Sequence, residues 1–189
     1  MTSVMGLGLG LGLAGAAGVR TYLPLIVMGL LTRFSETLSY RPPFRVFASV
    51  PVLLLLIALA GYELMVERSK DVSVGQFFTS IGLRAIGGAV IFAGLFEGFG
   101  TIFGIVVGMI IAVVSHMLKI RLYAVYGATE HRRDYAGLEE TVAVAGTVLA
   151  VLYPWSSYII WVSVLILYLK KLRNTNNRYK SELKARSWR

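Results

Sequence analysis

The chain has 189 residues, of which 56% are hydrophobic, 15% are charged and 20 are glycines. Because soluble domains carry about 25% charged residues and no long apolar stretches, this composition excludes an ordinary soluble domain. The net charge of +9 raises the question of nucleic acid. We expect no such partner, because many of the cations lie within residues 170–189, beside an apolar run, where basic residues mark the cytoplasmic side of a membrane.

The residue types that carry most enzyme chemistry are scarce. The chain has no cysteine, which excludes disulfide bonds, thiol catalysis and Cys-ligated metals. Its two histidines lack the HExxH spacing of a zinc site, and the apolar segments hold no nucleophile beside a base. We therefore expect no enzyme activity, no cofactor and no metal site.

Apolar runs that approach or exceed the ~20 residues needed to cross a bilayer recur along the chain. Six of them are expected to form helices: Val4 to Leu31, Val46 to Met65, Val74 to Phe96, Gly98 to Leu118, Glu139 to Tyr153 and Ser156 to Leu169. The sequence thus predicts an all-α integral membrane protein with about six transmembrane helices. They form a single domain over residues 1–169, followed by a basic cytoplasmic tail over 170–189.

The first segment is rich in glycine and is interrupted at Gly18, Arg20 and Pro24. As a helix it would carry two strips of small residues on nearly opposite faces, namely Gly8, Gly12 and Ala16, and Gly6, Gly10 and Ala14. One interpretation is a central packing helix, since small residues let neighbouring helices approach closely. The other is a broken or re-entrant backbone that lines a cavity, which the interruption favours.

Arg20 and Arg84 lie near the middle of their apolar segments. An arginine at that depth costs at least ~2.5 kcal/mol on insertion scales, so each is expected to face a partner or water. The candidate acidic partners lie near segment ends and are Glu63, Glu67, Glu97, Glu139 and Glu140. One interpretation is internal ion pairing that fixes helix register; the other is two guanidinium groups that hold an anion in a polar cavity.

Other polar residues have simpler interpretations. His116 and Lys119 share a helix face, where His116 would make a hydrogen bond between helices or serve a proton relay. Glu139 and Glu140 are expected to open the fifth helix and stabilise its N-terminus. Pro154 is expected in a tight turn, so that the last two segments form a hairpin. In the tail, Lys170, Lys171 and Arg173 are expected either to contact anionic lipid headgroups or to remain solvated on the cytoplasmic side.

The distribution of basic residues predicts the orientation. With the tail in the cytoplasm, residues 119–133 also lie inside, whereas the loop that carries Arg33, Arg41 and Arg45 lies outside, against the general bias. The N-terminus lies inside if the first segment spans once, and outside if that segment folds as a hairpin of two half-helices. No basic stretch precedes this segment, so we expect it to remain as a helix and not to be cleaved.

A short pattern of small residues followed by a basic residue occurs in both halves of the chain. Gly8, Gly12, Ala16 and Arg20 recur as Gly104, Gly108, Ala112 and His116. Six spans split into three and three would cross the membrane in opposite senses, which predicts an inverted repeat of residues 1–96 and 97–169 as one arrangement. The other interpretation is chance, because small residues at such spacings are common in membrane helices.

Several stretches resemble an uncharacterised family of bacterial membrane proteins, domain of unknown function 4126. They are GLAGAAGVRTYLPL (Gly12 to Leu25), RAIGGA (Arg84 to Ala89), the pair His116 and Lys119, and the run Leu138, Glu139 and Glu140. The resemblance extends to about Pro154; the chain departs from it at Glu140, where an Asp is expected. It implies a small protein that spans the inner membrane several times, and it implies no activity.

Two classes of function remain. The first is a transporter or channel for a small anionic solute, with a polar cavity built by the broken first segment, Arg20, Arg84 and His116. The second is a non-transporting subunit or lipid-organising protein that binds partner helices and anionic lipids. A second copy of the chain is a candidate partner in either class, and the expected location is the cytoplasmic (inner) membrane.

Overall fold

The computed structural model describes residues 3–35, 38–68, 74–96, 100–126, 132–163 and 166. Within these ranges the chain is all-helical and contains no strand. The elements are α1 (Ser3–Val19), α2 (Tyr22–Phe34), the short 3-10 helix η1 (Phe44–Ala48), α3 (Val50–Arg68), α4 (Val74–Leu95), α5 (Thr101–Tyr126) and α6 (Arg132–Leu152). A further helical stretch, residues 154–163, is called the final segment below.

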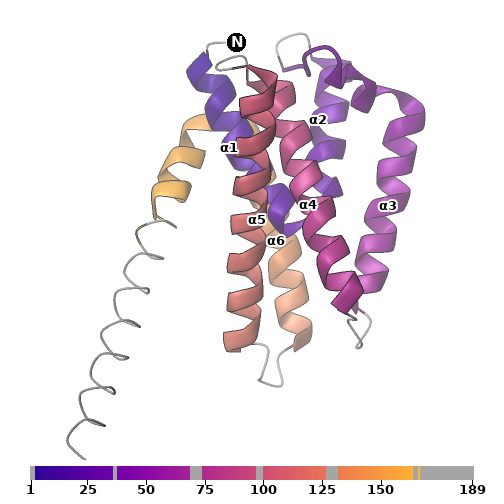
Figure 1. Ribbon diagram of the computed structural model, residues 1–189, viewed down its shortest axis with the longest axis vertical. Helices are drawn as coiled ribbons and strands as arrows, with labels where there is room; N and C mark the ends of the chain where they lie inside the picture. The colour runs from indigo at the N-terminus through magenta and orange to yellow at the C-terminus, as the bar shows by residue number, and fades with distance from the viewer. Residues whose placement is uncertain are drawn as a thin grey trace, which may run out of the picture.

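The first apolar segment is broken, as its interruption predicts. α1 ends at Val19, the chain bends at Arg20 and Thr21, and α2 begins at Tyr22. Pro24 is tolerated because it lies in the first turn of α2, where a missing N–H removes no intrahelical hydrogen bond. α1 descends from the end of the bundle marked N and α2 returns to that same end, so the pair forms a hairpin with its tip at mid-height (Figure 1).

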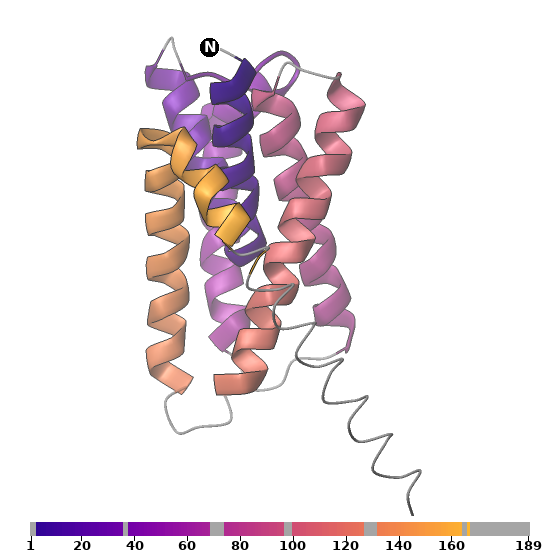
Figure 2. The ribbon, with the colours of Figure 1, turned by 90° about the vertical axis from the view of Figure 1, so that its left-hand side faces the viewer.

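The hairpin lies inside a bundle of longer helices. α1 packs on α4, α5 and α6, whereas α2 packs on α3 and η1 (Figures 1 and 2). The buried core between them includes Leu9 and Leu13 of α1, Met28 of α2 and Ile91 of α4. The side chains that fill this core are therefore supplied by both arms of the hairpin.

Close approach between helices depends on glycine. On α4 and α5, a methyl group added to either Gly88 or Gly108 would overlap the backbone carbonyl oxygen of the other. Gly104 of α5 likewise lies against Ala93 of α4. Because small residues remove the side-chain bulk between two backbones, they allow the van der Waals contact that holds helices together without a hydrophobic driving force.

The final segment crosses α1 and runs in the same direction (Figure 2). A methyl group at Gly8 would contact Pro154, and one at Gly12 would overlap Ser157 and Ala150. Two hydrogen bonds to the α1 backbone fix the crossing: Tyr158 Oη donates to Val4 O at 2.7 Å and Trp161 Nε1 donates to Leu11 O at 3.1 Å. The last two helices do form a hairpin, and its turn lies at Tyr153, directly before the expected position.

Several predicted boundaries are wrong. α5 continues to Tyr126 and does not end at Leu118, and α3 begins at Val50, after η1, and not at Val46. Glu139 and Glu140 do not open the fifth predicted helix, because α6 already begins at Arg132 and both residues lie two turns inside it. The apolar run marked only the hydrophobic part of this helix, and charged residues extend it toward its N-terminus. Both residues therefore lie beyond the first turn of the helix, where the helix dipole acts most strongly.

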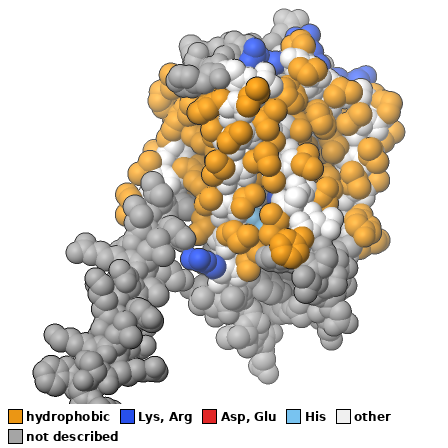
Figure 3. Space-filling view, viewed as in Figure 1, with side chains coloured by type: hydrophobic (Ala, Val, Ile, Leu, Met, Phe, Trp, Pro, Cys, Tyr) orange, Lys and Arg blue, Asp and Glu red, His pale blue; other side chains and the backbone are white. Residues whose placement is uncertain are grey.

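Many large hydrophobic side chains of the described residues are exposed on the outside of the bundle. Figure 3 shows hydrophobic side chains over most of one face, with Lys and Arg side chains gathered mainly at its upper rim. By length and composition, two stretches in the described part of the chain are suited to crossing a membrane, Phe78–Leu95 and Thr101–Arg121. Shorter apolar stretches are Val4–Val19, Tyr22–Phe34, Val50–Met65 and Thr141–Leu152.

Candidate functional site

The tip of the α1–α2 hairpin is surrounded by buried polar and charged side chains. Arg20 is 6% exposed and Thr21 is 3% exposed at the tip itself, while Arg84 on α4 is 2% exposed and His116 on α5 is 5% exposed. Burial of charged groups is costly unless hydrogen bonds and ion pairs compensate. The compensating contacts around this tip therefore define the candidate site.

Glu63 of α3 connects the tip to α4. Its Oε1 atom accepts hydrogen bonds from the Thr21 backbone N–H at 3.3 Å and from Thr21 Oγ1 at 3.1 Å. The same oxygen lies 3.2 Å from Arg84 Nη2 in an ion pair. Arg84 Nη1 also donates to Ser80 Oγ, one helical turn earlier on α4. One carboxylate thus joins three separate parts of the sequence.

The two ends of the broken helix meet opposite charges. Glu63 lies at the N-terminus of α2, where unsatisfied N–H groups and the helix dipole favour an anion. At the C-terminus of α1, Lys119 Nζ of α5 donates to Val19 O at 3.3 Å. The break is therefore stabilised on both sides, and a positive and a negative group are held at mid-height of the bundle.

The remaining predicted residues divide into three groups. His116 is buried on α5 one turn before Lys119, which itself contacts the end of α1. The Arg20 N–H continues the last turn of α1 by donating to Ala16 O. Glu139 and Glu140 lie in α6, but their side chains are outside the described part. Glu97, Lys170, Lys171 and Arg173 fall outside the described residues altogether, as does the side chain of Glu67.

The proposed packing residues all lie at helix contacts. Gly8 and Gly12 face α6 or the final segment, and Gly104 and Gly108 face α4. Ala16 and Ala112 are buried, and the backbone of Ala112 lies against Gly18. The strip that runs from Gly8 to Ala16 therefore belongs to the interior of the bundle.

Sequence reasoning missed Thr21 and Ser80. Thr21 holds Glu63 through both its backbone and its hydroxyl group, and Ser80 accepts from Arg84. Ser80 precedes Arg84 by four residues, so it lies on the same helix face, and this spacing was a usable signal. The position of Thr21 directly after Arg20, at a helix interruption, was a second one.

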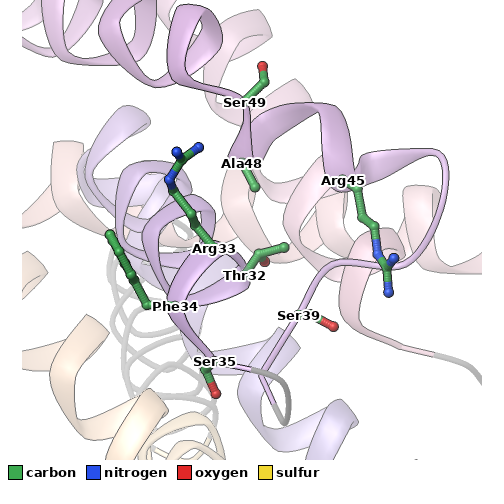
Figure 4. Close-up of a pocket in the computed structure, with 8 residues that line it drawn as sticks. All are labelled: Thr32, Arg33, Phe34, Ser35, Ser39, Arg45, Ala48 and Ser49. Atoms are coloured by element: carbon green, nitrogen blue, oxygen red, sulfur yellow. The ribbon is translucent and has the colours of Figure 1, made fainter.

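A second polar region lies at the end of the bundle near η1. A pocket of about 650 Å³ is lined by Thr32, Arg33, Phe34, Ser35, Ser39, Arg45, Ala48 and Ser49. Figure 4 shows Arg33 and Arg45 on opposite sides of this pocket, with their guanidinium groups directed apart. Since the two cations do not converge, the pocket does not form a single anion site.

Two of the three arginines of the loop that was expected outside have structural contacts at this end. Arg41 Nη1 donates to Phe96 O and Arg45 Nε donates to Tyr40 O, both at 3.1 Å. Tyr40 is fully buried against Gly94, and burial raises the pKa of its hydroxyl group. Arg41 and Arg45 therefore fasten the loop before η1 to the rest of the bundle.

Within the described part of the chain, no group of three or more His, Cys, Asp and Glu side chains gathers to hold a metal ion. The family model described as Domain of unknown function (DUF4126) matches residues 7–174. No curated protein and no solved structure matches the chain.

Proposed function

We propose that this chain, which belongs to the DUF4126 family, is a transporter or channel that moves a small anionic solute across the cytoplasmic membrane. The observation that carries the proposal is the hairpin whose tip stops at mid-height beside buried charges. Discontinuous helices that end inside a bundle are the usual way in which transporters present backbone groups to a solute.

Helix length and surface support the membrane assignment. At 1.5 Å per residue, helices of 19 residues (α3), 22 residues (α4), 26 residues (α5) and 21 residues (α6) approach or exceed the ~30 Å hydrocarbon core. Large apolar side chains are exposed along these helices, including Leu54, Ile86, Ile110 and Val148. In water such a surface would aggregate, whereas lipid would cover it.

The type of charged residue near the tip supports an anionic solute. Arg20, Arg84 and Lys119 are basic residues of the tip or of the helices beside it, so this region would attract a negatively charged solute. Guanidinium groups suit this role because they bind carboxylates and phosphates with a fork of N–H donors.

Flux measurements test the proposal. The purified protein would be reconstituted in liposomes loaded with a pH-insensitive, anion-sensitive dye and exposed in turn to chloride, acetate and phosphate. We expect protein-dependent uptake of at least one anion, and loss of that uptake in Arg84→Gln. The matched control is Arg33→Gln, which removes an exposed arginine far from the tip. No uptake above that of empty liposomes would contradict the transport proposal.

One observation favours the second class of function. Arg84 and Glu63 form an ion pair with each other, as expected of a structural ion pair that fixes the register of two helices. In that case the chain is a non-transporting subunit whose glycine-lined faces and basic tail bind partner helices, a second copy or anionic lipids. Loss of folding in Arg84→Gln, together with absence of flux in the wild type, would favour this class.

The predicted inverted repeat remains a proposal. In its favour, α1 and α5 both pack on α4. The recurring glycines differ in their contacts, however, because Gly8 and Gly12 face α6 or the final segment whereas Gly104 and Gly108 face α4. Against it, α5 is one continuous helix, whereas the first segment turns back on itself. The expected cytoplasmic location of the tail is likewise part of the proposal.

A further inference from the structure

The donors around Glu63 converge on a single oxygen atom. Two come from Thr21, the backbone N–H and the hydroxyl group, and one comes from Arg84 Nη2, with all three distances between 3.1 and 3.3 Å. The N–H belongs to the N-terminus of α2, a helix of 13 residues, so the helix dipole adds to the attraction for negative charge. Together these groups form a binding site for a carboxylate, and Glu63 occupies it.

The donors and the occupant belong to different layers of the bundle. Thr21 and Arg84 are fixed in the interior, where Arg84 is 2% exposed. Glu63 is less buried, with 12% of its side chain exposed, and it lies on α3, at the edge of the bundle (Figure 1). α3 packs on α2 and η1, and other faces of this helix expose Leu54, Leu55 and Ile57.

We propose that the Thr21 and Arg84 donors form the solute site and that the Glu63 carboxylate is a tethered occupant which a small monocarboxylate displaces. The chemistry of the occupant identifies the class of ligand, because the site already binds a carboxylate through an ion pair and two further hydrogen bonds. A rigid pair of donors with an exchangeable acceptor on the outer helix allows this substitution without rearrangement of the interior. The transport role of the site rests on the proposed function, but its binding of carboxylate does not.

Rescue of a truncated variant by added acetate tests the proposal. Glu63→Ala removes the tethered carboxylate and leaves the donors in place, so its melting temperature in detergent should be lowered. Sodium acetate at saturating concentration should then raise it by about 5 °C or more, through ligand binding to the folded state. An equal concentration of sodium chloride controls for ionic strength and inorganic phosphate for anion class; both should give smaller shifts.

Leu56→Ala is the matched control for this experiment. Leu56 is buried on the same helix, so its truncation loosens α3 without emptying the anion site. Acetate should raise the melting temperature of Leu56→Ala less than that of Glu63→Ala, because the tethered carboxylate still competes for the donors. It should not raise the melting temperature of the double variant Glu63→Ala with Arg84→Gln. Equal acetate effects on Glu63→Ala and Leu56→Ala would overturn the proposal.

Glu63→Gln tests the same site if Glu63→Ala does not fold. The amide keeps the shape of the side chain but loses the charge that competes with solute. Because a tethered group acts at an effective concentration in the millimolar range, its removal should increase the apparent affinity for acetate at least about tenfold over the wild type, as measured by thermal shift. Equal affinities in Glu63→Gln and the wild type would overturn the proposal.

The binding and flux experiments separate the two hypotheses. Acetate rescue without flux in liposomes would support the carboxylate site and contradict transport. Flux without rescue would support transport and overturn the assignment of Thr21 and Arg84 as the solute site.

Discussion

Lys119 Nζ lies 3.3 Å from the carbonyl oxygen of Val19, so a cation from α5 meets the last residue of α1. The carbonyl groups at a helix C-terminus carry partial negative charge and lack intrahelical partners. In the middle of the bundle water does not readily supply these hydrogen bonds. The lysine therefore stabilises the point at which the first segment breaks.

Replacement of Lys119 by Met should lower the stability of the protein by about 1 kcal/mol, the range of a cation at a helix C-terminus. Lys119→Arg retains both charge and donor and should be close to the wild type. Thermal unfolding of the two variants in the same detergent provides the comparison. Equal stability of Lys119→Met and Lys119→Arg would show that the hydrogen bond to Val19 contributes nothing.

The sequence predicted the helices well because apolar runs are long and their interruptions are sharp. Gly18, Arg20 and Pro24 marked the break in the first segment, and Pro154 marked the final turn. The start of α6 was missed because its first turns are charged, and hydrophobicity alone does not distinguish a polar helix end from a loop.

The candidate site was predicted only in part. The sequence identified Arg84 as a buried arginine and Glu63 as one of several candidate acidic partners, but it did not identify which carboxylate pairs with Arg84. Selection of the true pair required the packing of α3 against α2, which no periodicity encodes. Thr21 was missed because its role depends on the backbone N–H, and the residue type does not reveal that contribution.

Substitution of Gly12 by Leu should destabilise the bundle. Even a methyl group at this position overlaps Ser157 and Ala150, so α1 and the final segment must separate, at a cost of about 1–3 kcal/mol or more. Gly82→Leu is the matched control, since a methyl group added at Gly82 would meet no atom within 4 Å. Thermal unfolding should show a lower melting temperature for Gly12→Leu alone; similar values would mean that α1 does not pack here.

Cysteine labelling tests the orientation of the protein in the membrane. Because the chain has no native cysteine, each single-cysteine variant carries one reactive thiol. Residues 38–49 lie at the end of the bundle that carries η1, whereas α5 ends and α6 begins at the opposite end (Figure 1). With the tail in the cytoplasm, Ser39→Cys should react with an impermeant maleimide in intact cells, whereas Ala128→Cys and Ser187→Cys should react only after permeabilisation. Reaction of Ala128→Cys in intact cells would reverse the orientation.

Tyr40→Phe should stabilise the protein by about 1 kcal/mol, because the fully buried Tyr40 hydroxyl has no hydrogen-bond partner among the described residues. The gain should grow above pH 10. Burial raises the pKa of Tyr40, so at high pH the unfolded state loses a proton that the folded state retains, and stability falls with increasing pH. Denaturation curves of both proteins between pH 8 and pH 11 provide the measurement. If the difference in stability between the two proteins does not change with pH, the hypothesis that Tyr40 ionises in the unfolded state alone is contradicted.

A double-mutant cycle at Glu63 and Arg84 measures their coupling. Arg84→Gln leaves the Glu63 carboxylate without its cation in a mostly buried position, which should cost about 3 kcal/mol of folding stability. Glu63→Gln in the same protein removes the stranded charge, so the double variant should be more stable than Arg84→Gln alone. Stability in detergent should therefore show a coupling energy of at least about 1 kcal/mol between the two sites.

Arg20→Gln combined with Glu63→Gln serves as the comparison, since no ion pair joins Arg20 to Glu63 in the described contacts. Additive effects of Glu63→Gln and Arg84→Gln would show that their ion pair does not hold α3 to the interior of the bundle, and the carboxylate site would lose its basis.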